Sequence, residues 1–256
     1  MITAKDNSRI KAVSKLVFSA KKRRESGLFV LEGKRLCEEA LRENIVINEL
    51  FFTADALKNF GDLIEKFKNK AKFYSEVSRE VFLKMSDTDS PQGVLLTVSF
   101  KDVPTPNFTG KWIAFERIAD PSNLGAASRT AEALGISGIL LSKSGVDPYS
   151  PKSLRASMGA LLRLPVAVTD NFSESIENLK KNGFTVSGTV VDGNAQKIGS
   201  ITFNKNEIVL IGNEANGLTD EAKLLCDRLF TIPMSGRAES LNAAAAASIV
   251  MWEMVR

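Results

Sequence analysis

Apolar and polar residues alternate with two different periods along the first hundred positions. Short runs of apolar residues are typical of buried strands, and the stretches between them repeat apolar residues every three to four positions, as amphipathic helices do. In the expected helix 54–70, for example, Leu57, Phe60 and Ile64 fall on one face. This rhythm predicts a small parallel-type sheet covered by helices. The expected strands are 28–33, 47–53, 71–77 and 92–100, and the expected helices are 34–44, 54–70 and 78–87.

The rhythm stops at residues 101–110. This stretch, KDVPTPNFTG, contains two prolines, a glycine and no apolar period, which is typical of a linker. We therefore expect a first domain over 1–100 and a second domain over 111–256.

Strand and helix patterns alternate again after the linker and predict an α/β domain. Asn123 is a candidate cap for the first helix of this domain, and Gly135 is expected to end it. Pro151 suits the first turn of another helix. Thr219, followed by two acidic residues, marks a further helix start, because acids favour the positive end of a helix.

Composition limits the chemistry that this chain can perform. Among 256 residues, 44% are hydrophobic, 25% are charged and none is histidine. The absence of imidazole excludes Ser–His and Cys–His nucleophiles and argues against a metal site. The two cysteines, Cys37 and Cys226, are expected to be buried reduced thiols. The sequence shows no secretory signal pattern and no apolar run near the ~20 residues that span a bilayer, so we expect a cytoplasmic protein.

Positive charge is concentrated at the start of the chain. The net charge is +4, but residues 1–25 contain eight Lys or Arg against two acids, which leaves −2 for the remainder. Such a basic arm is typical of a protein that binds a polyanion, and a solvated helix face is the alternative. The candidate nucleic-acid-binding residues are Lys21, Lys22, Arg23 and Arg24.

Polar residues gather at three junctions where an expected strand ends and a helix begins. Ligands of parallel sheets bind at such junctions, beyond the carboxyl ends of the strands. The first junction holds Asn123 and Arg129, the second is the turn GNEANG, and the third is MSGRAESLN, in which Ser240 or Asn242 can cap the next helix. Neither a P-loop nor a G-x-G-x-x-G turn occurs, which argues against an ordinary dinucleotide-binding fold.

Together the three junctions resemble the motifs of one family. The segments N-L-G-A-A-S-R-T-A (123–131), I-G-N-E-A-N-G-L (211–218) and I-P-M-S-G-R-A-E-S-L-N-A (232–243) are similar, in order and spacing, to the motifs of the SpoU (TrmH) family. These are RNA ribose 2′-O-methyltransferases of the SPOUT superfamily. Residues 155–166 resemble the family's segment between its first two motifs. Residues 14–41 resemble its N-terminal substrate-binding domain, which is built like ribosomal protein L30e.

The resemblance implies a fold, a cofactor and partners. It implies an α/β C-terminal domain with a parallel sheet and a deep trefoil knot, which is a rare exception to the usual rules of chain connection. It further implies S-adenosylmethionine as methyl donor, no metal, structured RNA as substrate, and a homodimer formed through the knotted domain. The basic arm and the first domain are then expected to hold the RNA.

The same resemblance assigns roles to single residues. Arg129 is the candidate catalytic residue, either as a base tuned by a substrate phosphate or as an anchor for that phosphate which stabilises the developing alkoxide. The residues expected to position ribose and cofactor are Asn123, Glu214, Ser240 and Asn242. The residues expected to bind the cofactor are Gly212, Asn213, Gly217, Ile232, Met234, Gly236 and Leu241.

The RNA itself is less narrowly defined. The ribosomal-protein-like domain favours 23S ribosomal RNA over transfer RNA. A non-catalytic RNA-binding protein on the same fold and a base methyltransferase on a related knotted fold stay open as alternatives.

The alanines at 243–247 predict a helix, and the motif context suggests that this helix has no room for larger side chains. We therefore expect Ala245→Leu to disturb cofactor binding or dimerisation.

Overall fold

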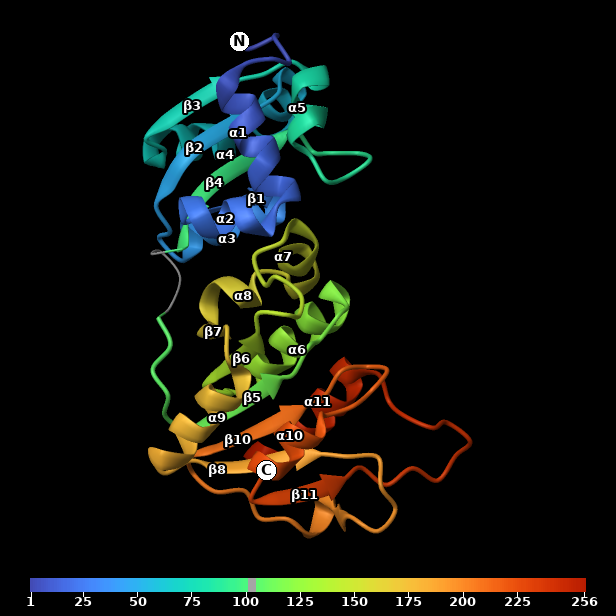
Figure 1. Ribbon diagram of the computed structural model, residues 1–256. Coiled ribbons are helices and arrows are strands. Elements are labelled where there is room, and N and C mark those ends of the chain that lie inside the picture. The colour runs from blue at the N-terminus through green and yellow to red at the C-terminus, as the bar shows by residue number, and fades with distance from the viewer. Residues whose placement is uncertain (101–104) are drawn as a thin grey trace. The chain divides into compact units, whose positions relative to one another are not determined.

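A computed structural model describes residues 1–100 and 105–256, which form two compact units (Figure 1). The first unit contains the described residues up to Phe100 and also Tyr149–Arg163; the second contains Thr105–Pro148 and Leu164–Arg256. Part of the expected linker, 101–104, lies outside the described residues. The domain limits predicted from the sequence stay predictions, and the structure adds that Tyr149–Arg163 packs within the first unit.

The first unit contains a mixed four-stranded sheet in the order β1-β4-β2-β3. β2 and β3 are parallel, whereas β4 is antiparallel to both of its neighbours. The expectation of a parallel-type sheet was therefore wrong for β4. The preceding helix α5 has seven residues, about 10 Å of helix, which is too short to return the chain along a strand of about 20 Å. The strands are β1 (Leu28–Glu32), β2 (Ile47–Phe52), β3 (Phe73–Glu76) and β4 (Val94–Ser99).

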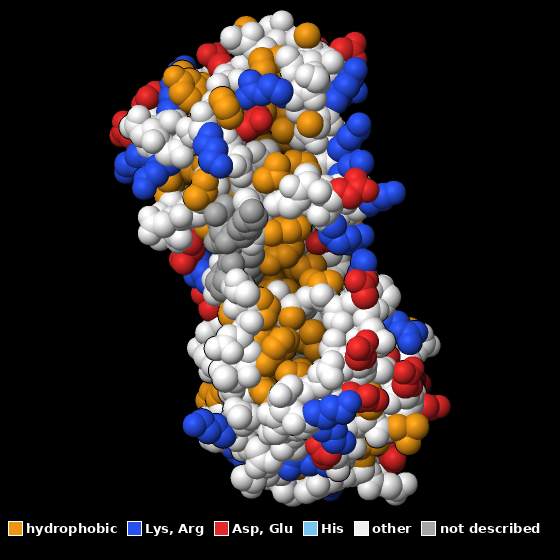
Figure 2. Space-filling model, turned by 60° about the vertical axis from the view of Figure 1, so that its left-hand side comes forward, with side chains coloured by type: hydrophobic (Ala, Val, Ile, Leu, Met, Phe, Trp, Pro, Cys, Tyr) orange, Lys and Arg blue, Asp and Glu red, His pale blue; other side chains and the backbone are white. Residues whose placement is uncertain are grey.

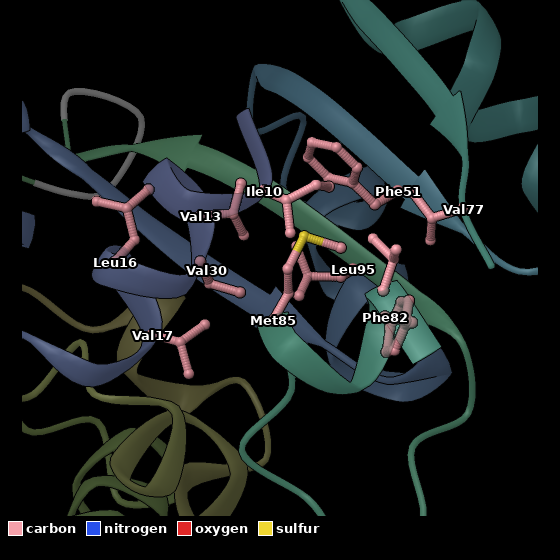
Figure 3. Packing of buried hydrophobic residues seen from close by; sticks show 11 residues of the cluster. Ile10, Val13, Leu16, Val17, Val30, Phe51, Val77, Phe82, Met85 and Leu95 are labelled. Carbon is pink, nitrogen blue, oxygen red and sulfur yellow. The ribbon is translucent and has the colours of Figure 1, made fainter. Parts of the chain in front are cut away.

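Amphipathic helices cover this sheet and bury its apolar side chains. Residues from α1, α5 and the strands form one core cluster, in which Ile10, Phe51 and Met85 are almost fully buried (Figure 3). The helices of the unit are α1 (Ser8–Phe18), α2 (Ala20–Ser26), α3 (Lys34–Arg42), α4 (Ala54–Lys70), α5 (Arg79–Met85), α7 (Pro151–Ser157) and α8 (Ala160–Arg163). As expected, Pro151 occupies the first turn of α7.

The second unit contains a seven-stranded sheet in the order β7-β6-β5-β10-β8-β11-β9, with every pair parallel. This confirms the α/β class predicted for the C-terminal domain. Strand order and direction do not define how the chain is threaded, so the trefoil knot stays a prediction. The strands are β5 (Lys111–Phe115), β6 (Gly138–Ser142), β7 (Val166–Thr169), β8 (Thr185–Thr189), β9 (Gln196–Lys197), β10 (Glu207–Ile211) and β11 (Arg228–Thr231).

The helices of the second unit begin and end at residues whose side chains explain their limits. Thr219 accepts a hydrogen bond from the Ala222 amide and caps α10, as predicted. Gly135 has the left-handed φ of 70° expected after a helix end. The prediction that Asn123 caps α6 was wrong, because Asp120 takes that place one turn earlier and leaves the Asn123 amide for other partners. The helices are α6 (Pro121–Ala133), α9 (Phe172–Lys181), α10 (Asp220–Leu225), α11 (Ala243–Val255) and the 3-10 turn η2 (Ile198–Ser200).

Neither cysteine forms a disulfide. Cys37 is fully buried, as expected, whereas Cys226 is half-buried, which corrects the expectation that both are enclosed. Burial raises the pKa of the Cys226 thiol to about 12, so it stays protonated at neutral pH. No helix in the described parts of the chain is long and apolar enough to cross a membrane.

Candidate active site

Four adjacent strands of the parallel sheet, β5, β10, β8 and β11, deliver their following loops to one edge. A cavity of about 700 Å³ opens there, lined by the loops after β10, β8 and β11. Two of these loops were predicted from the sequence. The loop that follows β8, 190–195, was missed, although it contains an Asp-Gly-Asn turn and also follows the carboxyl end of a strand.

The loop after β10 is a tight turn that requires two glycines. The backbone groups of Asn213 and Gly217 exchange hydrogen bonds of 3.0 and 2.9 Å. A Cβ on Gly212 would lie 2.1 Å from the carbonyl carbon of Gly217. Gly217 itself has a φ of 66°, which side chains rarely tolerate. Both glycines therefore shape the wall of the cavity through backbone geometry.

The side chain of Asn213 fastens this turn to the end of β5. Its Oδ1 accepts hydrogen bonds from the amides of Ala215 and Asn216 at 3.0 and 3.3 Å. Its Nδ2 donates to the carbonyl oxygen of Arg117 at 2.9 Å. Asn213 lines the cavity, but these bonds already engage both of its polar atoms.

Glu214 connects the three segments that the sequence singled out. Its carboxylate accepts hydrogen bonds from Asn123 Nδ2 at 2.9 Å and from the backbone amides of Ala119 and Asp120 at 3.2 and 3.4 Å. The Oδ1 of Asn123 in turn accepts a bond from Asn242 Nδ2 at 3.3 Å. The predicted positioning residues Asn123, Glu214 and Asn242 therefore form one hydrogen-bonded group.

These hydrogen bonds decide the ionisation of Glu214. Partial burial acts to raise its pKa, but the bonds from Asn123 and the backbone amides outweigh that effect and lower the pKa from the ordinary value of 4.5. Glu214 is consequently ionised at neutral pH. It acts as a hydrogen-bond acceptor that holds the Asn123 amide, and its low pKa makes it a poor proton acceptor.

Asn242 also starts the alanine helix. Its Oδ1 accepts a 2.7 Å hydrogen bond from the Ala245 amide, which confirms it as the cap of α11. Ala247 is fully buried, and α11 packs beside α6, where Thr130 and Ser248 exchange a 3.1 Å hydrogen bond. Ala245, by contrast, is exposed. The expectation of limited space therefore holds for the buried alanines of the run, and for Ala245, which is exposed in the single chain, it stays a prediction that depends on the dimer.

The remaining predicted residues fall into two groups. Ile232, Met234, Ser240 and Leu241 line the cavity together with Gly212, Asn213, Glu214 and Gly217. Gly236 is not among the lining residues, and a Cβ there would meet no atom within 4 Å, so its expected close approach to a ligand stays a prediction. Arg129 lies exposed on α6 and has no hydrogen bond or ion pair to any described residue.

Two residues that follow β5, Glu116 and Arg117, hold the loops of the site in place and were not predicted from the sequence. Glu116 is buried and accepts hydrogen bonds from the amide and hydroxyl of Thr219 at 2.9 and 2.7 Å. Arg117 has a φ of 60°, an unfavourable conformation for a residue with a side chain. Its amide donates to Ser142 Oγ at 2.8 Å. No sequence signal marks this strain, since a left-handed residue at a strand end is ordinarily glycine.

The predicted basic quartet is not a uniform surface. Arg23 is 4% exposed and donates to the carbonyl oxygens of Leu16 and Val17 at 2.6 and 2.9 Å. Its assignment as an RNA-binding residue was therefore wrong, because its guanidinium is used inside the fold. Lys21 and Lys22 are exposed but pair with Glu25 at 3.8 and 2.6 Å. Arg24 is exposed and has no such partner among the described residues.

The cavity suits a cationic, partly aromatic cofactor. Its carboxylates come from Asp192, Glu214 and Glu239, against one lysine, Lys223. This excess of negative charge matches a sulfonium group. Apolar side chains for the flat part of a ligand come from Leu218, Leu229, Ile232 and Leu241. No cluster of potential metal ligands occurs in the residues that the structure describes.

An all-parallel sheet with a cavity built from three strand-end loops, and no glycine-rich dinucleotide turn, defines an α/β domain with a ligand site that differs from the ordinary dinucleotide-binding fold. The chain belongs to the SpoU rRNA methylase family, whose model matches residues 111–252. A second model, the MRM3-like substrate binding domain, matches residues 7–96. The protein is thus an S-adenosylmethionine-dependent RNA 2′-O-methyltransferase with an N-terminal substrate-binding domain.

Individual relatives resemble the chain along its whole length. An uncharacterized tRNA/rRNA methyltransferase of Synechocystis is 33% identical over 100% of this chain and 93% of its own. The 23S rRNA (guanosine(2553)-2′-O)-methyltransferase RlmP of Bacillus subtilis is 27% identical over 99% and 98%. The structure of an AdoMet-bound rRNA methyltransferase from Sinorhizobium meliloti superposes with a TM-score of 0.83, at 30% identity over 98% and 95%.

Proposed function

We propose that this enzyme methylates a ribose 2′-hydroxyl of 23S ribosomal RNA, with Arg129 as the residue that contacts the reacting nucleotide. The observation that carries the proposal is the hydrogen-bonded group Asn123–Glu214–Asn242 at the edge of the cofactor cavity. It joins the start of α6, which carries Arg129, to the loops that form the cavity wall.

The proposed chemistry requires little of the protein beyond alignment. When bound, S-adenosylmethionine supplies an electrophilic methyl group on its sulfonium. The cavity residues Gly212, Ile232, Met234 and Leu241 would hold it, with Gly236 beside them, and Ser240, Asn123 and Asn242 would position the ribose. Holding the reacting groups in line lowers the barrier mainly through orientation.

Arg129 is proposed to bind the phosphate next to the target ribose. Its guanidinium is exposed and has no partner among the described residues, so it is available to a substrate. Guanidinium groups stay protonated in proteins and form paired hydrogen bonds to phosphate. The positive charge would then stabilise the alkoxide that develops on the 2′-oxygen. A guanidinium that stays protonated suits the role of anchor better than that of base.

The choice of ribosomal RNA rests on similarity over the whole chain. The Bacillus subtilis relative, which is a 23S rRNA methyltransferase by name, aligns with both units, including the MRM3-like substrate-binding domain. Transfer RNA is the second candidate, because the Synechocystis relative is described as a tRNA/rRNA methyltransferase.

We also propose that the enzyme is a homodimer and that α11 contributes to the interface. Apolar side chains on this helix are exposed in the single chain: Ile249 is 37%, Trp252 55% and Val255 38% exposed. Together with Ala245 they give α11 an apolar face that water covers in a monomer. Sedimentation at micromolar concentration should show a dimer, and Trp252→Ala should weaken it. A wild-type monomer would contradict this proposal.

Transfer of a labelled methyl group tests the substrate. The purified enzyme with radiolabelled S-adenosylmethionine should label unmodified 23S rRNA, and nuclease digestion should yield a 2′-O-methyl nucleoside. Label in transfer RNA alone would favour the second candidate, and a methylated base would contradict ribose methylation. Absence of calorimetric binding of S-adenosylmethionine would support the alternative of a non-catalytic RNA-binding protein.

A further inference from the structure

A short segment of the first unit alternates lysines with aromatic residues. Residues 66–74 read KFKNKAKFY, with four lysines, three aromatic residues and no acid. The segment covers the last turns of α4 and the start of β3. Because β3 is the outermost strand of its sheet, one side of it has no neighbouring strand. We refer to Lys66, Lys68, Lys70, Lys72 and Tyr74 as the lysine strip.

Lys68 is the member of the strip that the structure places against Tyr74. Tyr74 is 55% exposed, and Lys68 Nζ lies 5.6 Å from the centre of its ring and 5.0 Å from that of Phe52. Lys72 Nζ donates to Asn48 Oδ1 at 2.9 Å. Since side chains alternate along a strand, Tyr74 and Phe52, which lie two register positions apart on β3 and β2, point to the face that α4 covers.

Most of the charge in the strip is available to a ligand. Lys66 and Lys70 are exposed and have no ion pair or hydrogen bond among the described residues. Lys68 pairs with one acid, Glu65, at 2.7 Å. In residues 1–25, by contrast, most basic side chains pair with carboxylates of the same unit: Lys5, Arg9, Lys11, Lys21 and Lys22. Lys15 and Arg24 have no such partner among the described residues. Figure 2 shows Lys and Arg side chains interspersed with hydrophobic ones on the surface of the first unit.

From this arrangement we propose that the lysine strip binds an unpaired stretch of the substrate RNA. One base would stack on the exposed ring of Tyr74, and Lys66, Lys70 and Lys72 would bind the adjoining phosphates. Aromatic rings flanked by cations bind single-stranded nucleic acid in this way, independently of sequence. The inference rests on the proposed function, since it assumes that RNA is the substrate.

A simpler role for the lysines makes a different prediction. Lys68 and Lys70 occupy the last turn of α4, where cations favour the negative end of the helix. If that were their only role, replacing them would lower the stability of the protein and leave its affinity for RNA unchanged.

Binding of unmodified 23S rRNA, measured by filter retention over a range of salt concentrations, tests the proposal. The variant with Lys66→Gln, Lys70→Gln and Lys72→Gln should reduce the slope of log affinity against log salt by about 2, at ~0.7 per single-strand phosphate contact. Tyr74→Ala should weaken binding about tenfold, within the range for loss of one stacked base. Tyr74→Phe, which keeps the ring, should bind within about twofold of wild type.

Matched controls distinguish a loss of RNA binding from a loss of folding, and a failure of this proposal from a failure of the proposed function. Lys181→Gln with Lys205→Gln changes two exposed lysines of the second unit and should have a smaller effect on the slope. Thermal unfolding and calorimetric cofactor binding should be unchanged in the strip variants, and KM for RNA should rise while kcat is retained. Wild-type affinity and salt slope in both the triple variant and Tyr74→Ala would overturn the proposal that the lysine strip binds RNA. If wild-type enzyme methylates only transfer RNA, the proposed substrate fails, and the same variants are then measured on transfer RNA.

Discussion

The two sheets of this protein differ in what their sequence reveals about function. In the second unit every strand is parallel, so the carboxyl ends of β5, β10, β8 and β11 lie at one edge and their loops meet. In the first unit β4 is reversed, and strand ends point both ways. Polar residues after parallel strands therefore converge on a site, whereas charged residues in the mixed unit are spread over its surface, where many of them pair with each other.

The same difference explains why sequence motifs located the site better than counts of charged residues located the RNA-binding surface. Glu214 and Asn242 lie 28 positions apart in the chain, yet both contact Asn123, because parallel topology places their loops together. The excess of positive charge at residues 1–25 also looked functional. It is largely used within the fold, through ion pairs and the buried guanidinium of Arg23.

Loss of Arg129 should have the largest effect. Arg129→Ala should lower kcat by at least about 100-fold, as expected for removing one group that stabilises developing charge. Arg129→Lys should also lose most activity, because lysine lacks the paired donors of guanidinium. Methyl-transfer kinetics with 23S rRNA provide the measurement, and Lys181→Ala, at the exposed end of α9, is the control. Near-normal turnover by Arg129→Lys would remove the guanidinium from the mechanism.

The alanine helix allows two neighbouring substitutions to be compared. Ala247 is fully buried, so Ala247→Leu should cost about 2–3 kcal/mol in unfolding free energy through overpacking on the buried face of α11. Ala245 is exposed in the single chain, so Ala245→Leu should change the free energy of unfolding of the monomer by less than about 0.5 kcal/mol, and its effect is expected on the dimer instead. Urea denaturation measures both. If the two variants unfolded alike, the described packing of α11 would be wrong.

In the first unit, substitution of the neighbouring residues Arg23 and Arg24 distinguishes a structural role from a role in RNA binding. Arg23→Ala removes the donor to two carbonyl oxygens at the end of α1 and should destabilise the protein by about 2 kcal/mol. Arg24→Ala, at an exposed and unpaired position, should leave the stability unchanged. Thermal unfolding is the readout. An unchanged midpoint for Arg23→Ala, together with weaker RNA binding, would restore the original assignment of Arg23 to the RNA surface.

Backbone strain at Arg117 should give the smallest effect, and one of opposite sign. Glycine adopts the φ of 60° found there without penalty, so Arg117→Gly should raise the free energy of unfolding by about 1 kcal/mol. The mutation keeps the backbone groups that bond to Ser142 and Asn213. Lower stability in this variant would show that the Arg117 side chain contributes more than the strain costs.

Much of the fold and part of the site followed from local sequence pattern. The helix end at Gly135 and the caps Thr219 and Asn242 depend on interactions close in sequence, whereas the lining residues Ile232 and Leu241 were assigned by the family resemblance. The rest depends on distant partners. The reversed β4 reflects the shortness of α5, and the burial of Arg23 reflects carbonyl groups that only the α1–α2 corner brings to it.

Ribose methylation maps of cellular RNA test the central claim most directly. Total RNA from cells that lack this gene should miss one 2′-O-methyl group in 23S rRNA. The wild-type gene should restore that group, and the gene carrying Arg129→Ala should not. A 23S map that is unchanged by the loss of the gene would contradict the account.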